Sequence, residues 1–205
     1  MQNDVLDTAA TVASRTLEGR AAAYADEVRR LVDATYVVMR RRGTLDPRVS
    51  DIVREAGLSN QVFYRHFRGK DELLLAVLDD GQRRLESYLV ARMARVPSGR
   101  EQVRAWVEGV LEQARNAEAA ENTRPFASNA VRLADRFPAE HTASRHRLLD
   151  PLRTAVLEAG GDAGDADAIY HLAMGRMQDA VVRREQPSTA EVEHLVTFAL
   201  RGISV

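Results

Sequence analysis

Hydrophobic residues recur every three or four positions along most of the chain, which is the period of an amphipathic helix. The last segment is a clear example, because Val192, Val196 and Ala199 fall on one stripe. No stretch alternates hydrophobic and polar residues as a half-buried strand does, and no Asn-Gly pair marks a hairpin. The pattern therefore predicts an all-α protein.

A first helix is expected to end near residue 42. Hydrophobic residues from Val28 to Met39 lie on one stripe, and the arginines and the glycine that follow, ending at Gly43, are helix stop signals. Residues 1–24 are rich in alanine and only weakly periodic. They are expected to form a partly ordered arm or a frayed helix.

Two short helices follow, joined by a turn that contains a glycine. Asp46-Pro47 is a start signal, because an aspartate can cap free N–H groups and proline suits the first helical position, so Asp46 is the predicted N-cap. The second helix is expected from Asn60 to about Phe67, with Ser59 as its cap. Hydrophobic residues at helical spacing are expected to form the core of this pair: Val49, Ile52, Val53, Ala56, Phe63 and Phe67.

The rest of the chain carries further helical segments. They are expected at residues 71 to about 96, 103–114, 126–137, 148–159 and 169–181, with a last helix that begins at Pro187-Ser188-Thr189. Asp150-Pro151 falls inside one of these segments. Because proline cannot donate to the preceding turn, that helix either kinks or starts there.

The composition excludes several kinds of site. The chain has 205 residues, a formal net charge of -1 and no cysteine, which removes disulfides, thiolate zinc sites and cysteine nucleophiles. No hydrophobic run approaches the roughly 20 residues that cross a bilayer, and no basic stretch followed by an apolar one resembles an export signal. We therefore expect a cytoplasmic protein of one or two globular domains, with no metal ion and no cofactor.

Positive charge is concentrated near the two short helices. Between Arg40 and Lys70, eight basic residues face three acidic ones. Such a patch either attracts phosphate groups or forms a solvated surface. Burying the apolar positions of the helix pair would turn the start of its second helix outward, and the DNA major groove, about 12 Å wide, admits a helix. The pair therefore predicts a helix-turn-helix that binds DNA.

The run from Gly57 to Leu73 resembles the DNA-binding region of the TetR family of transcriptional regulators. It combines a glycine turn, a Tyr-x-His-Phe block, a lysine four residues after the histidine and an acidic-apolar helix start. The resemblance extends from Val28 to Leu78, and the remaining chain agrees only in length, helical period and an apolar final helix. It implies an N-terminal three-helix helix-turn-helix domain followed by a helical ligand-binding and dimerisation domain.

The resemblance also implies which residues contact DNA. They are Ser50, Ser59, Asn60, Gln61, Val62, Tyr64, Arg65, His66 and Lys70. In relatives, the residues at Tyr64, His66 and Lys70 usually hold phosphate, so base readout falls mainly to Asn60, Gln61 and Arg65. Val62 would offer an apolar contact to a thymine methyl group.

Some of these positions depart from the family pattern or have a second interpretation. Gln61 stands where relatives commonly have a small residue, and Arg48 stands where they have a threonine, so operator preference does not transfer. Asp46-Pro47 is expected to replace the lost threonine cap. The Tyr64 hydroxyl and the His66 ring could instead anchor the fold.

The C-terminal part is expected to bind an effector and to dimerise. By the resemblance, a homodimer forms through the last two helices, and their apolar stripes are suited to a four-helix bundle with a symmetry mate, with Gly175 permitting close approach. Two-fold symmetry predicts a palindromic operator on double-stranded DNA. The expected divisions are an arm at 1–24, a DNA-binding domain at 25–72 and an effector and dimerisation domain at 73–205.

A largely apolar cavity for a small molecule is expected in that last domain. Its candidate lining residues are Tyr88, Met93, Trp106, Leu111, Phe126, Leu133, Phe137, Arg176 and Met177. Such residues at helical spacing are also typical of an ordinary core. Arg176 shares a stripe with hydrophobic residues and would pair an effector anion or a carboxylate of a partner chain, or extend its charged end into water.

Other functions find less support. No His-Glu-x-x-His, phosphate-binding glycine loop or Gly-x-Ser-x-Gly is present, and a helical-bundle hydrolase would have to use His171 or His194 with nearby carboxylates. We therefore expect a regulator rather than an enzyme: a repressor that a small effector releases from its operator by shifting a population of conformations. Control by a protein partner is the alternative, which a closed effector domain would favour.

Overall fold

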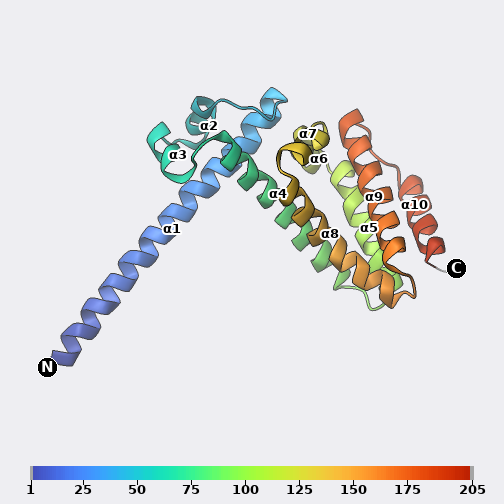
Figure 1. Ribbon diagram of the computed structural model, residues 1–205, viewed down its shortest axis with the longest axis horizontal. Coiled ribbons are helices and arrows are strands. Elements are labelled where there is room, and N and C mark those ends of the chain that lie inside the picture. Colours follow the sequence, from blue (N-terminus) through green and yellow to red (C-terminus); the bar gives the residue numbers. More distant parts are fainter. Residues whose placement is uncertain (1, 204–205) are drawn as a thin grey trace. The chain divides into compact units, whose positions relative to one another are not determined.

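A computed structural model describes residues 2–203 of the chain, and its side chains from residue 14 onward. Over that range it contains helices and no strand, so the all-α prediction is confirmed (Figure 1). The helices are α1 (Gln2–Arg42), α2 (Val49–Ala56), α3 (Asn60–His66), α4 (Lys70–Met93), α5 (Gly99–Arg115), α6 (Ala117–Ala127), α7 (Ala130–Arg136), α8 (Pro138–Glu158), α9 (Ala163–Arg183) and α10 (Thr189–Gly202).

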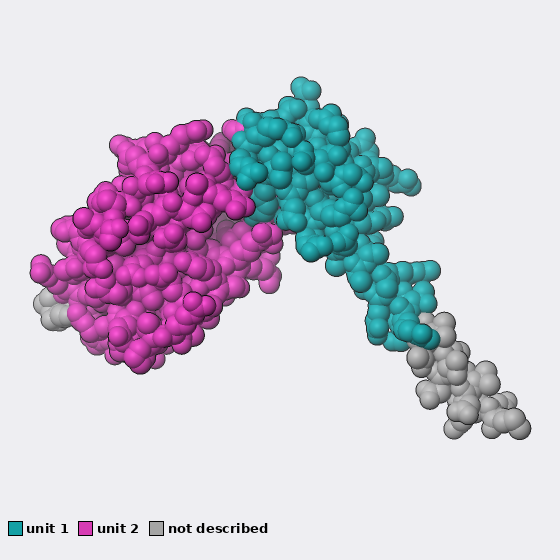
Figure 2. Space-filling model, turned by 180° about the vertical axis from the view of Figure 1, so that it is seen from behind, with its two compact units in different colours: residues 1–42, 46–74 teal, residues 43–45, 75–205 magenta. Residues whose placement is uncertain are grey.

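The chain forms two compact units, coloured separately in Figure 2. Unit 1 comprises the described residues up to 42 together with 46–74, and unit 2 comprises 43–45 and the described residues from 75 onward. The segment for which the sequence indicates an arm or a frayed helix is the first part of α1. Its described side chains, from residue 14 to 25, are exposed.

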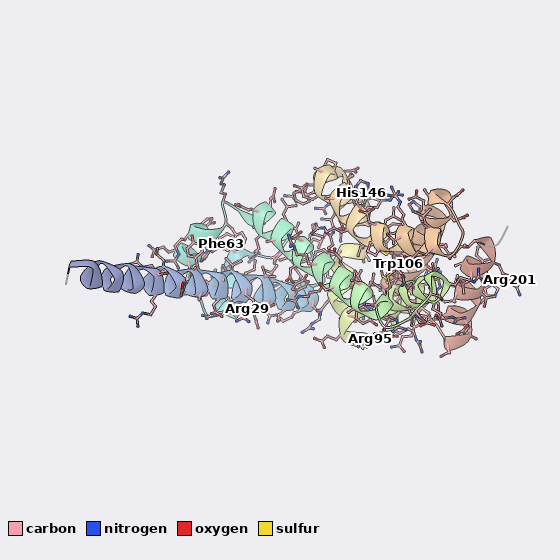
Figure 3. All side chains as sticks on the ribbon, turned by 90° about the horizontal axis from the view of Figure 1, so that it is seen from below. Arg29, Phe63, Arg95, Trp106, His146 and Arg201 are labelled. Carbon is pink, nitrogen blue, oxygen red and sulfur yellow. The ribbon has the colours of Figure 1, made fainter. Side chains whose placement is uncertain are left out.

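Unit 1 packs α2 and α3 against the C-terminal half of α1. Ile52 of α2 and Phe63 of α3 are fully buried, and Phe67, at the end of α3, is 5% exposed, as the spacing predicts. Leu31 and Val38 of α1 complete this core, in which Figure 3 labels Phe63. The predicted end of α1 is also confirmed, since the helix stops at Arg42 and the glycine that follows has a φ of 61°.

The predicted start of α2 is wrong. The helix begins at Val49 rather than at Pro47, and the residue in the N-cap position is Arg48, whose side chain makes no capping hydrogen bond. Asp46 lies too far from the helix start to cap it, and its carboxylate accepts from the Lys70 ammonium instead. Asp46-Pro47 therefore does not replace a threonine cap.

Unit 2 has its core around α5, which packs against α6, α8, α9 and α10 (Figure 1). Trp106 of α5, labelled in Figure 3, is fully buried, and its Nε1 donates to the Leu148 carbonyl oxygen of α8 at 3.1 Å. The last helix begins where the sequence predicts, at Thr189, and Ser188 is its N-cap. Its apolar stripe is buried within the chain: Val192, Val196, Ala199 and Ile203 all belong to this core.

Three other helix predictions in this unit need correction. Of the two alternatives for Pro151, a kink or a start, the start is wrong, because α8 continues through this residue from Pro138 to Glu158. The single helix expected at 126–137 is two helices, α6 and α7, separated where Asn129 donates its side-chain amide to the Pro125 carbonyl at 2.9 Å. The long helix expected to reach residue 96 ends as α4 at Met93. No helix among the described residues has the length and hydropathy needed to cross a membrane.

Candidate nucleic-acid interface

A tight turn sets the angle between α2 and α3. Gly57 caps α2 with a φ of 64°, in the left-handed region that favours glycine. Arg30 of α1 donates from Nη2 to the Ala56 carbonyl oxygen at 2.6 Å and to that of Gly57 at 3.2 Å. A Cβ at position 57 would lie 3.2 Å from this nitrogen, so glycine also leaves room for the arginine.

Ser59 starts α3 as the sequence predicts. Its hydroxyl accepts from the Val62 N–H at 3.2 Å and satisfies one of the free donors of the first turn. Phe63 then turns into the core, which leaves the opposite side of the helix at the surface.

The structure leaves most of the expected contact residues at the surface of unit 1. The exposed residues among them are Ser50, Ser59, Asn60, Gln61, Tyr64, Arg65 and Lys70. Tyr64 is 62% exposed, which argues against a hydroxyl that anchors the fold. Val62 is half-buried. Five of these exposed residues therefore lie on α3 or at its cap, so polar or aromatic groups are available on one short helix.

His66 differs from the residues around it. Its side chain is only 1% exposed, and its Nε2 lies 2.6 Å from Oε2 of Glu27 on α1. An ionised carboxylate can only accept a hydrogen bond, so Nε2 of His66 is the donor. The Tyr24 ring meets the His66 ring edge-on, with centroids 4.0 Å apart. The ring is thus enclosed by the fold, and the expected phosphate contact from His66 gives way to the alternative in which it anchors α3 to α1.

Arg65 is held by the same carboxylate. Its Nη2 donates to Oε2 of Glu27 at 2.5 Å, while its side chain remains 48% exposed. The hydrogen bonds from His66 and Arg65 lower the pKa of Glu27 below its usual value, so Glu27 is ionised at neutral pH. Two expected contact residues therefore share one anionic partner.

The acidic residues of the basic patch are all engaged with its cations. Asp51, 5% exposed, forms an ion pair with Arg42 at 2.8 Å and accepts from Arg54 at 2.6 Å, and Glu55 accepts from Arg41 at 2.9 Å. Eight cations against three carboxylates still leave an excess of positive charge. Because an exposed ion pair such as Arg41–Glu55 contributes only about 0–1 kcal/mol, a phosphate can compete for that cation.

Sequence reasoning missed three residues of α1 that support α3 and its turn. Tyr24, Glu27 and Arg30 are spaced three residues apart, so they share one face of the helix. Tyr24 lies four residues before Val28 and so on the hydrophobic stripe of α1, which was the available signal for it. The expected domain boundary at residue 25 separated Tyr24 from the helix pair that it contacts.

The candidate effector residues do not form one group. Met93, Trp106, Leu111 and Met177 are buried together in the core of unit 2, which favours the ordinary-core interpretation for them. The others lie outside that core: Tyr88 is 39% exposed, Leu133 is 8% exposed, and Phe126 and Phe137 are half-buried.

Arg176 already has partners in its own chain. Its Nη2 donates to Oε1 of Glu191 at 3.1 Å, and carboxylate oxygens of Glu185 and Asp179 lie at 3.6 Å and 3.9 Å. The side chain is 23% exposed. An effector anion or a partner carboxylate would therefore have to compete with three carboxylates that surround this guanidinium.

Comparison with known proteins identifies relatives of unit 1. The family model described as "Bacterial regulatory proteins, tetR family" matches residues 31–77. Over 77 residues the chain is 38% identical to the HTH-type transcriptional regulator BetI of Brucella anthropi, covering 38% of this chain and 40% of the relative. Over 68 residues it is 41% identical to the HTH-type transcriptional regulator SrpR of Pseudomonas putida, covering 33% of this chain and 32% of the relative. The matches thus span less than half the length of these curated relatives.

The fold of the whole chain also has solved counterparts. A TetR-family transcriptional regulator from Streptomyces coelicolor superposes with a TM-score of 0.64 at 24% identity. The match covers 88% of this chain and 93% of that one. The likeness in fold therefore extends into the helices of unit 2.

Proposed function

We propose that this chain, which belongs to the TetR family of bacterial regulatory proteins, is a DNA-binding transcriptional regulator that reads the major groove with α3. The observation that carries the proposal is the surface of α3. Phe63 anchors one side of the helix in the core, while Asn60, Gln61 and Arg65 are exposed on other sides. A single helix fits a groove about 12 Å wide, and amide and guanidinium groups match base edges there.

The exposed residues divide into two roles. Asn60, Gln61 and Arg65 contact base edges, whereas Tyr64 and Lys70 contact phosphate. Lys70 is 45% exposed, and its pair with Asp46 is an exposed one that a phosphate can replace. Ser50 and Ser59 add hydroxyl contacts, and Val62 an apolar one. Contacts to the DNA backbone fix the orientation of the protein, and contacts to the bases fix its sequence preference.

The functional protein is a homodimer that pairs through α9 and α10. Three exposed features of these helices support this arrangement: Phe198 is 64% exposed, Val182 is 45% exposed, and a Cβ at Gly175 would meet no atom within 4 Å. The buried stripe of α10 gives no such support, because its own chain covers it. Two copies would present two α3 helices, so the operator is a palindrome with half-sites about one helical turn apart.

Regulation follows from a shift between two conformations of the dimer. Residues 25–72 bind DNA, and residues 73–205 bind a small, largely apolar effector that favours the conformation with lower operator affinity, so the chain acts as a repressor. The family resemblance supports this assignment. A panel of apolar small molecules tests it: an effector must raise the unfolding temperature of the chain and also release it from the operator.

Two substitutions test the division of roles on a duplex enriched from random sequences. Asn60→Ala should reduce the preference between that duplex and a scrambled one by about tenfold, since one good base contact contributes roughly 1–3 kcal/mol of discrimination. Lys70→Ala should weaken binding to both duplexes alike and reduce the slope of log affinity against log salt by about one. Equal loss on both duplexes for both variants would contradict the division.

A further inference from the structure

Two residues of α1, outside the helix pair, fix the last turn of α3. The Tyr24 hydroxyl donates to the Arg65 carbonyl oxygen at 3.3 Å, and Oε2 of Glu27 accepts from both Arg65 at 2.5 Å and His66 at 2.6 Å. The Arg65 guanidinium also lies over the Tyr24 ring, 5.8 Å from its centroid. Glu27 therefore holds one exposed side chain and one buried side chain of α3 at once.

An arginine that reads a base gains from being held in this way. Its long side chain has many rotamers, and ordering it on the base costs conformational entropy. A carboxylate that binds one nitrogen of the fork before DNA arrives has already selected a rotamer. The planar guanidinium has five N–H donors, so an arginine bound through Nη2 keeps donors for a guanine edge.

The His66 contact makes the carboxylate itself a fixed group. Glu27 is 24% exposed and Arg65 is 48% exposed, whereas the His66 side chain is 1% exposed. A carboxylate paired only with an exposed arginine would move with it. The buried His66 ring, 2.6 Å away, holds Oε2 in a fixed position at the edge of the protein core. Glu27 therefore orients Arg65 as a fixed group and not as another mobile side chain.

We propose that Glu27 is a positioning residue that sets the base preference of Arg65. This inference rests on the proposed function, because it requires that α3 enters the major groove. It assigns part of the sequence preference to a residue of α1 that lies 38 positions before the arginine that it orients.

Because Glu27 is charged, the proposal predicts opposite effects of its replacement on non-specific affinity and on base preference. A carboxylate beside the binding surface repels phosphate, so removing its charge strengthens sequence-independent binding. Loss of the Arg65 orientation weakens preference for the correct base. Glu27→Gln should therefore raise affinity for random duplexes while it lowers discrimination, whereas a variant that merely damages the fold loses both.

Asp26 supplies a matched control. It is the neighbour of Glu27 on α1, carries the same charge, and pairs with Arg29 at 2.6 Å rather than with any residue of α3. Asp26→Asn thus removes one negative charge from the same turn of the helix without touching Arg65. It should change non-specific affinity in the same direction as Glu27→Gln and leave base preference unchanged.

The experiment enriches duplexes with randomised cores using the full-length wild-type chain, Glu27→Gln, Asp26→Asn, Arg65→Ala and the double variant Glu27→Gln/Arg65→Ala. We expect Arg65→Ala to lose preference at one position of each half-site, by about tenfold. Glu27→Gln should lose at least threefold, on the order expected for a weakened base contact, at that same position. The double variant should match Arg65→Ala, because Glu27 acts through Arg65.

The outcomes separate this inference from the proposed function. If the wild-type chain enriches no sequence, the proposed function fails and this inference fails with it. If the wild-type chain enriches a palindrome but Glu27→Gln selects it with an unchanged profile, or Asp26→Asn loses the same position, only this inference is overturned. Should Glu27→Gln fail to fold, Glu27→Asp keeps the charge and withdraws the carboxylate from both donors; an unchanged profile for that variant would overturn the inference equally.

Discussion

Gly99, the first residue of α5, packs directly against the end of α8. A Cβ built at this position would lie 2.6 Å from the Ala155 carbonyl oxygen, 2.7 Å from Cβ of Glu158 and 2.8 Å from the Ala159 nitrogen. Ordinary contacts of a Cβ begin near 3.4 Å. Two of the three atoms belong to the main chain, so no side-chain rotation relieves the overlap in Gly99→Ala, and α5 and α8 have to separate.

The expected cost follows from two opposing effects. Adding a methyl group to a close-packed contact costs about 1–3 kcal/mol. Replacing glycine by alanine in a helix returns about 0.5–1 kcal/mol of that. Taking the middle of each range, we expect Gly99→Ala to lower the free energy of unfolding of unit 2 by about 1 kcal/mol.

Trp106 provides the assay, because it is the one tryptophan of the sequence and is fully buried on α5 itself. Urea unfolding followed by its fluorescence reports the stability of unit 2. Gly202→Ala is the control, since a Cβ there would meet nothing within 4 Å; it should not destabilise unit 2, and the helix propensity of alanine should stabilise it by up to about 1 kcal/mol. A Gly99→Ala chain as stable as the wild type would refute the close approach of α5 and α8.

Two further predictions concern helix caps. Ser59→Ala removes the acceptor for the Val62 N–H and should cost unit 1 about 1 kcal/mol in denaturation followed by circular dichroism, whereas Ser59→Asn should retain most of the stability. At α10, the Ser188 N–H and then the Arg176 guanidinium hold the pKa of Glu191 at about 2, below its usual 4.5. Because this pKa is lower in the folded chain than in the unfolded chain, the ionised Glu191 carboxylate stabilises the folded state fully above pH 4.5. This stabilisation is lost as the pH falls toward 2. The wild type should therefore exceed Glu191→Gln in stability at neutral pH, and the difference should shrink across this window; a difference independent of pH would contradict the assigned contacts.

Local signals were sufficient for α3. Its bounds, the Ser59 cap and the buried Phe63 depend on residues a few positions apart, and periodicity and capping chemistry describe such short-range contacts well. The same is true of the start of α10 at Ser188.

Partners far apart in sequence were not predictable in this way. Asp46 has the residue type of a cap, but it precedes the helix start by three residues and its carboxylate pairs with Lys70, 24 positions away. His66 has the residue type of a phosphate contact, but its ring is enclosed by Tyr24 and Glu27 of α1. Each side chain had two chemically reasonable partners, and only the folded arrangement of unit 1 decides between them.

The buried stripe of α10 has a similar ambiguity. An apolar stripe that covers the core of its own chain has the same period as one that faces a second copy. Val196 and its neighbours cover the core, which leaves Phe198 as the more informative residue for an interface. Periodicity identifies which residues are buried, but it does not identify the surface that buries them.

Enrichment of DNA duplexes with randomised cores, comparing the wild-type chain with Tyr64→Ala, tests the central claim most directly. Tyr64 is 62% exposed, so its replacement should leave the core of unit 1 intact while removing an expected phosphate contact from α3. Because a phosphate contact supports binding to every sequence, we predict that the wild-type chain enriches a palindrome and that Tyr64→Ala enriches the same palindrome more weakly. Absence of any enriched sequence with folded wild-type protein, after denaturation, removal of bound molecules and refolding, would contradict it.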